Sequence, residues 1–302
     1  MLCSHAKTSD RPRTMEDRPG ELRHRDVERR FRRAARLFRD GDFVHRHTAA
    51  GIVERVAPMR VQAARVVDLG SGVGRDRKLL QRRFPKAMVI GIDRSAEMLA
   101  EAQRQRSWFS RYRDVRADAL QLPMRDGSID LVYSNLLLPW IDDHAAMFSE
   151  VTRVLRKGGL FVFSTLGPDS FRELRAAWGE TDSISHVRPF PDMHDVGDRL
   201  VRSGLRDPVL DVETLVLEYR DTDSLVRDIA RAAAGNSLRD RRRSLTGKTA
   251  LATMIDRLTQ GGAALPLTIT LELVFGHAWG GGRAERSDEF HVPAATIGLR
   301  RR

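Results

Sequence analysis

The sequence predicts an α/β protein with a doubly wound, mostly parallel sheet of the Rossmann-like type. Three observations lead to this prediction. Short apolar runs alternate with helical segments from about residue 60 onward, the first run enters a glycine-rich turn, and acids follow the next two runs. Alternating strands and helices favour a parallel sheet, because each helix serves as the crossover between two parallel strands.

The N-terminal part is expected to be a polar tail followed by helices. Residues 1–25 lack the apolar run of a signal peptide and are predicted to be a disordered tail. A helical pattern extends from Val27 to about Val56, and Gly41 and Gly51 are expected to interrupt it. Residues 281–302 are predicted to be a loose C-terminal tail, which leaves 26–280 as one domain.

The cofactor-binding core is predicted over about residues 60–166. Its expected strands are 64–70, 87–93, 115–120, 128–136 and 158–166, and its expected helices are 75–84, 95–105 and 142–155. Residues 167–265 are expected to form an insertion of helices and a strand that covers an acceptor site, with helices at 170–178, 193–204, 223–234 and 249–260, and a strand at 208–220. A last strand is predicted at 266–280.

The glycine-rich turn follows the first predicted strand. It reads Asp-x-Gly-x-Gly-x-Gly, with Asp68 as the acid and Gly70, Gly72 and Gly74 as the glycines. Glycine permits positive φ and close approach of a ligand to the backbone, and the amides at the following helix start favour an electron-rich group. The spacing differs from the dinucleotide pattern Gly-x-Gly-x-x-Gly. A tight turn with no ligand is the alternative interpretation.

Two acids at later strand ends favour the ligand site. Asp93 closes the second strand about 20 residues after the glycines, where a carboxylate can accept hydrogen bonds from ribose hydroxyls. Asp118 ends the third predicted strand and can accept from an adenine amino group. All three strand ends lie on the carboxyl edge of the sheet, where open α/β folds bind ligands.

These segments resemble the successive motifs of class I S-adenosylmethionine-dependent methyltransferases. The resemblance covers about residues 60–166 in the segments DLGSGVG, GIDRSAEML, ADALQLP, IDLVYSNL and LRKGGLFVFSTL. It implies S-adenosylmethionine as the cofactor and implies that these residues bind it: Asp68, Gly70, Ser71, Gly72, Gly74, Asp93, Arg94, Asp118, Ala119, Asn135 and Leu136.

The flanking segments resemble a narrower family, the malonyl-acyl-carrier-protein O-methyltransferases of biotin synthesis. This resemblance covers roughly residues 27–280, in RRFRRAARLFRDGDFVHRHTAAGIVERV near the start and STLGPDSFRELRAAW, GNSLRDRRRSLTG and LPLTITLELVFGHAWG later. Phe38 departs from it, since family members commonly have tyrosine there. Mitochondrial complex I assembly proteins, one of which is taken to hydroxylate arginine, resemble the same blocks and remain an alternative.

The narrower resemblance implies methyl transfer to the free carboxylate of a malonyl thioester. A carboxylate is already ionised at neutral pH, so this chemistry needs no general base and no metal, only alignment and exclusion of water. Arg175 is the candidate clamp for the acceptor carboxylate, because guanidinium binds it through two parallel hydrogen bonds; a solvated helix arginine is the alternative. Asn135 and Leu136 are expected to line the transfer pocket, with Trp140 as a wall or as core packing.

Composition narrows the partners and the compartment. The net charge is +11, but only five of the 52 basic residues are lysines and the arginines are spread along the chain. We therefore expect no nucleic-acid partner, and a nucleic-acid-binding protein remains a further alternative. We expect a basic face that steers an acidic acyl-carrier protein carrying malonyl towards the site. The lone Cys3 favours a cytoplasmic location, and the lack of a long apolar run argues against a membrane protein. No metal is expected, because the spacing of His144, His186, His194 and His277 is not that of metal ligands.

Overall fold

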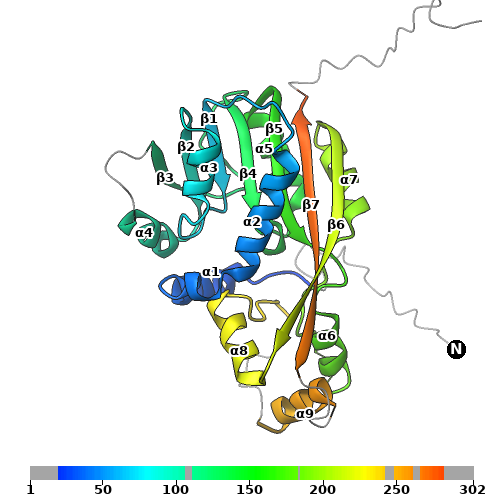
Figure 1. Ribbon diagram of the computed structural model, residues 1–302. Coiled ribbons are helices and arrows are strands. Elements are labelled where there is room, and N and C mark those ends of the chain that lie inside the picture. Colours follow the sequence, from blue (N-terminus) through cyan, green and yellow to red (C-terminus); the bar gives the residue numbers. More distant parts are fainter. Residues whose placement is uncertain (1–19, 106–110, 183, 242–247, 261–265, 282–302) are drawn as a thin grey trace, which may run out of the picture.

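The computed structural model describes residues 20–105, 111–182, 184–241, 248–260 and 266–281 of the chain. The described residues form one seven-stranded sheet in the order β3-β2-β1-β4-β5-β7-β6 (Figure 1). The strands are β1 Arg65–Leu69, β2 Met88–Asp93, β3 Tyr112–Arg116, β4 Ile129–Asn135, β5 Leu155–Leu166, β6 Leu205–Tyr219 and β7 Leu267–Gly280. This arrangement confirms the doubly wound sheet that the sequence predicts.

Strands β1 to β6 run in the same direction, and β7 runs in the opposite direction between β5 and β6. β1 pairs with β2 on one side and with β4 on the other, so that Val67 lies opposite both Ile90 and Val132. β7 pairs antiparallel with β5 and with β6. The strand order reverses between β1 and β4, and such a reversal opens a crevice at the carboxyl ends of the strands.

Helices cover both faces of this sheet. They are α1 His24–Ala34, α2 Phe43–Val56, α3 Arg77–Arg83, α4 Ala96–Arg104, α5 His144–Val154, α6 Arg172–Gly179, α7 Met193–Arg202, α8 Thr222–Arg231 and α9 Lys248–Thr259, with short 3-10 turns η2 Phe38–Gly41 and η3 Leu138–Trp140. The Ser95 side chain caps α4 by accepting from the amide of Met98, as the sequence predicts.

Adjacent residues of β1 enter different cores, which explains the continuous apolar run in the sequence. Val66 packs with α2 and α3 on one face, through Ile52 and Leu80. Val67 packs with α5 and α7 on the other face, in a cluster that includes Phe148. A strand buried on both faces has no polar side to alternate with its apolar one.

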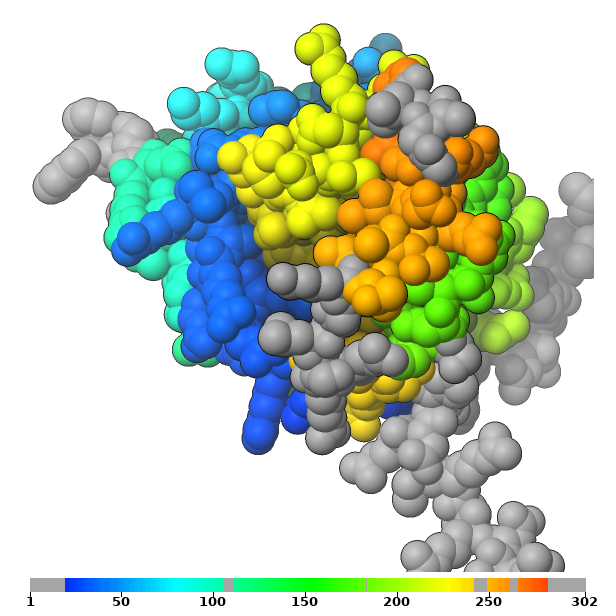
Figure 2. Space-filling model, turned by 90° about the horizontal axis from the view of Figure 1, so that it is seen from below, coloured from blue at the N-terminus to red at the C-terminus, as the bar shows by residue number. Residues whose placement is uncertain are grey.

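The long strands β6 and β7 extend beyond the rest of the sheet, down to α6, α8 and α9 (Figure 1). Side chains of these helices form a separate cluster with the strand ends, including Leu174, Leu225, Met254 and Ile269. Seen from below, the N-terminal segment in blue lies beside the yellow segment that contains α8 (Figure 2). The C-terminal region therefore contacts the opening helices of the chain.

The structure differs from the predicted boundaries in three places. Gly41 ends η2 as expected, but α2 continues through Gly51. The position is occupied by glycine because a Cβ there would meet the buried ring of Phe275 at 2.7 Å. β3 ends at Arg116, two residues before Asp118, which follows in a bridge with Gln121. The predicted N-terminal tail of residues 1–25 is too long, because Leu22 forms a bridge with Leu238 and α1 begins at His24, while residues 1–19 and 282–302 of the predicted tails lie outside the described residues.

The contact between Gly51 and Phe275 makes a testable prediction. Alanine is usually favoured over glycine inside a helix by about 0.5–1 kcal/mol. Overpacking against a fixed ring costs about 1–3 kcal/mol, so Gly51→Ala is expected to lower the free energy of unfolding. Urea denaturation followed by circular dichroism measures this. Gly179→Ala is the control, since nothing lies within 4 Å of a Cβ there; equal stability of Gly51→Ala and the unchanged protein would contradict the packing argument.

Candidate active site

The described residues surround a cavity of about 430 Å³ at the carboxyl ends of the parallel strands. It lies at the reversal of strand order between β1 and β4, where this fold class binds ligands. Its wall combines the glycine-rich turn, the ends of β2 and β4, the residues that follow β3, and the N-terminal helices. The N-terminal part of the wall is contributed by His24, Val27, Glu28, Phe31, Phe38 and His45.

The glycine-rich turn takes the conformation that its glycines predict. Gly70, Gly72 and Gly74 all have positive φ, between 50° and 77°. The amides of Gly70 and Ser71 donate to the carbonyl oxygen of Ile92 at 2.8 and 3.0 Å, which ties the turn to β2. No atom lies within 4 Å of a Cβ built on Gly72, so a ligand has open access to the backbone there.

The carboxylate of Asp93 joins two backbone segments at the cavity. Its Oδ2 accepts from the amide of Gly72 at 2.9 Å and its Oδ1 accepts from the amide of Ser95 at 2.8 Å. Burial raises the pKa of Asp93, while the two amide hydrogen bonds act in the opposite direction. Each carboxylate oxygen keeps a second lone pair, so Asp93 can also accept hydrogen bonds from a ligand.

Asp118 is more open than Asp93. Its Oδ1 accepts from the amide of Leu120 at 3.0 Å, and Arg94 lies 3.6 Å from Oδ2. The side chain is 40% exposed. Its position beside Ala119 in the cavity wall matches the edge where the sequence predicts recognition of an adenine.

Asp68 is a deeply buried acid at the end of β1. Its Oδ2 accepts from the hydroxyl of Tyr112 at 3.2 Å. Burial, reinforced by the nearby charge of Asp76, raises the pKa of Asp68 well above its ordinary value. The acid is thus held near two further carboxylates of the same wall, Asp76 and Asp93, where a cationic ligand group would lower the energy of the cluster.

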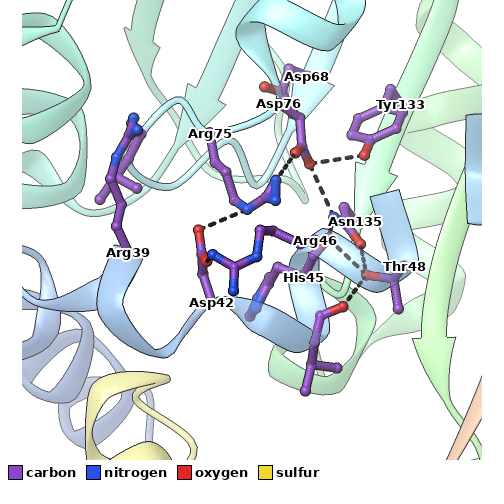
Figure 3. Close-up of polar contacts among 12 residues, drawn as sticks. Arg39, Asp42, His45, Arg46, Thr48, Asp68, Arg75, Asp76, Tyr133 and Asn135 are labelled. Atoms are coloured by element: carbon purple, nitrogen blue, oxygen red, sulfur yellow. Dashed lines mark hydrogen bonds and ion pairs between the residues drawn. The ribbon is translucent and has the colours of Figure 1, made fainter. Parts of the chain in front are cut away.

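An ionic chain connects the N-terminal helices to the turn (Figure 3). Arg75 contacts Asp42 at 2.8 Å through Nε and Asp76 at 2.7 Å through Nη1. Asp76 also accepts from the hydroxyl of Tyr133 at 2.8 Å. Because Asp42 and Asp76 are almost fully buried, Arg75 balances two charges that water does not reach.

Asn135 joins four segments through its side-chain amide. Its Nδ2 donates to the carbonyl oxygen of His45 and to Asp76, each at 3.0 Å. Its Oδ1 accepts from the hydroxyls of Thr48 at 2.6 Å and Ser164 at 2.7 Å. These bonds use both donors and both lone pairs of the amide. Asn135 therefore fixes α2 against the ends of β4 and β5 (Figure 3).

A row of aromatic rings lines the opposite side of the cavity. Trp140 meets Phe31 edge to face with ring centroids 5.0 Å apart, and Phe31 lies 6.3 Å from Phe38. Phe38 in turn contacts the ring of His45 at 5.0 Å. Trp140 is therefore part of the cavity wall, which favours the first of its two interpretations over core packing.

Most of the predicted site residues come together in this wall. The cavity is lined by Asp68, Gly70, Ser71, Gly72, Asp93, Arg94, Asp118, Ala119, Asn135 and Leu136. Gly74 is outside the lining, and a Cβ there would meet Arg77 and Ala102, so its role in the structure is close packing of the turn on α4. Arg175 is also outside the lining and donates to the carbonyl oxygen of Pro168.

The described residues between 167 and 260 brace the wall without lining it. The lining residues end at Asp143. The guanidinium of Arg188 donates to the carbonyl oxygens of Pro139 and Ile141 at 2.8 and 3.0 Å and to Asp142 at 2.9 Å. The C-terminal region thus holds the segment that carries Trp140 in place, and its predicted role as a cover over the acceptor stays a prediction.

The four histidines considered as metal ligands in the sequence, His144, His186, His194 and His277, have structural partners or lie outside the cavity lining. His144 bonds to the carbonyl oxygen of Leu138, and His186 stacks on Trp178 with centroids 3.6 Å apart. Within the described residues, no three His, Cys, Asp or Glu side chains gather as a metal site would require. In the same part of the chain, no helix has the length and apolar character that crossing a bilayer demands.

Sequence reasoning missed His45, Arg75 and Asp76 as parts of the wall, and Asp42 as the buried partner of Arg75. Arg75 and Asp76 directly follow the last glycine of the turn, so their place at the start of α3 was a usable signal. Asp42 and His45 belong to a helical segment in which nothing marks the two residues as different from other polar positions.

Comparison with known proteins agrees with the fold and identifies relatives. A family model described as a methyltransferase domain matches residues 67–163. A malonyl-[acyl-carrier protein] O-methyltransferase of Gallionella capsiferriformans is 38% identical over 242 residues, which is 78% of this chain and 83% of that protein. Proteins with the same name from Halorhodospira halophila and Laribacter hongkongensis are 39% and 40% identical, over 86% and 78% of this chain and 89% and 82% of their own lengths.

Solved structures share the fold at lower identity. The protein YcgJ of Bacillus subtilis matches with a TM-score of 0.56 and 19% identity, covering 77% of this chain and 98% of that one. A putative methyltransferase of Bacillus halodurans matches with a TM-score of 0.56 and 17% identity over the same shares. Both support the Rossmann-like architecture described above.

The buried ionic chain predicts a large difference between two arginine substitutions. Arg75→Met leaves Asp42 and Asp76 without their shared cation and is expected to lower the free energy of unfolding by about 3–5 kcal/mol. Arg202→Met is the control, because Arg202 and its partner Asp198 are 77% and 69% exposed. An exposed pair is worth less than about 1 kcal/mol. Urea denaturation at neutral pH compares the two, and similar losses would contradict the assigned role of Arg75.

Proposed function

Since the chain belongs to the malonyl-[acyl-carrier protein] O-methyltransferase family, we propose that it transfers a methyl group from S-adenosylmethionine to the free carboxylate of a malonyl thioester. The observation that carries this proposal is a cavity whose wall joins a glycine-rich turn to acids at successive strand ends. The family resemblance places the reaction in biotin synthesis.

The cavity suits the chemistry of the proposed methyl donor. The open backbone at Gly72 leaves room for the amino-acid part of the donor, and the free lone pairs of Asp93 can accept from its ribose hydroxyls. Asp118 is available for the adenine amino group. The sulfonium is a cation, and its charge would favour the ionised form of Asp68, whose pKa is raised by burial and by the nearby Asp76.

The reaction we propose is an in-line displacement at carbon. A carboxylate oxygen of the malonyl group forms a bond to the methyl carbon, and the carbon–sulfur bond breaks with its electron pair going to sulfur. The products are a methyl ester and S-adenosylhomocysteine. Carboxylates are ionised at neutral pH, so the site needs to align oxygen, carbon and sulfur and to exclude water. The apolar rings of Phe31, Phe38 and Trp140 serve the exclusion of water.

Arg175 remains a proposed clamp for the acceptor carboxylate. To act in this way its guanidinium must leave the carbonyl oxygen of Pro168, to which it donates in the present structure. Its helix, α6, belongs to the region that braces the wall. A movement of α6 towards the cavity would be needed to bring the guanidinium to a substrate.

We propose an acyl-carrier protein with an acidic surface as the partner that delivers malonyl. The first helix, α1, lines the cavity through Phe31, and exposed arginines lie on α1 at Arg32 and in the turn directly after it at Arg36. Charges of opposite sign on two partners steer their encounter and fix their orientation.

The arginine hydroxylase alternative is not favoured, because the relatives reported above are named as methyltransferases. The described cavity wall also has no feature that favours arginine hydroxylation over methyl transfer. An acceptor assay decides between the two: purified protein, labelled S-adenosylmethionine and malonyl-carrier protein should give a labelled methyl ester that base hydrolysis releases as methanol.

Substitution of Asp93 tests the donor site. Asp93→Asn keeps the shape of the side chain but removes the charge that strengthens its hydrogen bonds, so the Kd for S-adenosylhomocysteine is expected to rise about tenfold or more. Isothermal titration calorimetry measures this Kd. Asp198→Asn, on the exposed side of α7, serves as the control. Absence of binding to the unchanged protein would bring down the proposed function.

Charge reversal on α1 tests the partner. Arg32→Glu with Arg36→Glu is expected to raise the KM for malonyl-carrier protein severalfold at low salt, with less effect as salt screens the charges. The KM for a short malonyl thioester without the protein should stay unchanged. Arg125→Glu is the control, since this exposed residue precedes β4 and lies away from the cavity. Equal effects on both acceptors would argue against docking on α1.

A further inference from the structure

His45 is a polar residue of the cavity wall for which the site described so far has no use. It lies in the first turn of α2 and borders the cavity. Its Nδ1 is buried and has no hydrogen-bond partner. Its other ring nitrogen, Nε2, is not among the buried unpartnered atoms, and no described residue bonds to it, so Nε2 is the nitrogen that the cavity can reach.

The neighbours of His45 fix where the ring points. The carbonyl oxygen of His45 accepts from the amide of Asn135 at 3.0 Å, which anchors this turn of α2 to the end of β4. The ring of Phe38 meets the imidazole edge to face, with an interplanar angle of 66°. The imidazole is thus held from its backbone and from one side of its ring, beside the ionic chain of Asp42, Arg75 and Asp76 (Figure 3).

An anionic acceptor needs a hydrogen-bond donor in a wall rich in acids. Arg75 is bound to Asp42 and Asp76, and Arg94 lies against Asp118. Asn135 has both of its donors engaged, with His45 and Asp76 as their acceptors. Donors already bound to carboxylates must break those bonds before they can bind another one. The imidazole of His45 has no such bond to give up.

The surroundings also decide the charge and the tautomer of the imidazole. Burial lowers the pKa of His45 to about 4, with Asp76 and Asp42 acting to raise it and Arg75 acting to lower it. The ring is therefore neutral at pH 7 and carries one proton. An unpaired buried N–H is costly, so the proton resides on Nε2, at the cavity, and leaves the lone pair on Nδ1.

We propose that His45 binds the acceptor: its Nε2–H donates to the carboxylate oxygen of the malonyl group that does not attack, and so turns the other oxygen towards the methyl carbon. This assignment rests on the proposed function. A hydrogen bond from a neutral donor orients the carboxylate without forming a tight ion pair, which would reduce the electron density of the attacking oxygen. No proton is transferred, since the ester and the thioether form without one.

The experiment measures steady-state methyl transfer to a short malonyl thioester in His45→Phe and His45→Gln. Loss of a hydrogen bond to a charged group corresponds to about a tenfold to hundredfold change. In His45→Phe we expect kcat/KM for the acceptor to fall by about this factor, while the Kd for S-adenosylhomocysteine changes less than about threefold. His45→Gln retains an N–H donor and is expected to recover part of the loss.

The matched control is His47→Gln, two residues further along α2. The imidazole of His47 is directed to Glu213, 2.5 Å away, and lies outside the cavity lining. The variant His47→Gln should leave both the kcat/KM for the acceptor and the Kd for S-adenosylhomocysteine unchanged. Circular dichroism and the melting temperature of each variant show whether α2 remains folded, and His45→Gln keeps the test meaningful if His45→Phe fails to fold.

Three outcomes would overturn the role of His45. They are full acceptor turnover in folded His45→Phe, a loss confined to the binding of S-adenosylhomocysteine, and equal losses in His45→Phe and His45→Gln. An inflection near pH 6.5 in kcat/KM that disappears in His45→Gln would also contradict it, because it would report an imidazole that titrates in contact with solvent. If the unchanged protein binds S-adenosylhomocysteine but does not methylate the thioester, the proposed function fails instead.

Discussion

The shape of the cavity depends on the four hydrogen bonds of the Asn135 side chain. A parallel sheet of this type leaves a crevice where the strand order reverses, and α2 packs on β4, β5 and β7 beside that crevice. Asn135 links α2, through His45 and Thr48, to Asp76 at the start of α3 and to Ser164 of β5. An amide side chain is suited to this task, since it offers two donors and two lone pairs without a net charge.

The ionic chain next to Asn135 adds a second constraint, which is electrostatic. Asp68, Asp76 and Asp93 face the cavity from three successive segments, Arg75 pairs with Asp76, and burial raises the pKa values of Asp68 and Asp93, so a cation beside them would favour their ionised forms. A wall of this kind stabilises a sulfonium and disfavours an anion. Transfer of the methyl group removes the positive charge from sulfur, so the same wall holds the product less strongly than the donor. An anionic acceptor therefore needs a neutral donor in this wall, and the imidazole of His45, which meets Phe38 of the aromatic row, is placed to supply one.

The sequence was sufficient to predict the sheet and the part of the cavity nearest to it. Continuous apolar runs, positive-φ glycines and the acid after the second strand are local features with a direct structural meaning, and they placed Asp93 and Gly72 correctly in one wall. The partners of the ionic chain could not be predicted in this way. Asp42 and Arg75 are 33 positions apart, and although Arg75 directly follows the glycine-rich turn, no local pattern pairs it with Asp42.

Helical periodicity reports that one face of a helix is buried, but it does not report which surface covers that face. This is why periodicity alone does not show that the opening helices form part of the cavity wall, and only the family resemblance at Phe38 pointed to it. In the structure α1 is tied to the C-terminal region by the pair of Asp26 with Arg241 and by the backbone bond from Arg23 to Ser237. Arg188 fixes the segment around Trp140 from the same region. The C-terminal half thus shapes the acceptor side indirectly, because it sets the positions of the two segments that carry the aromatic row.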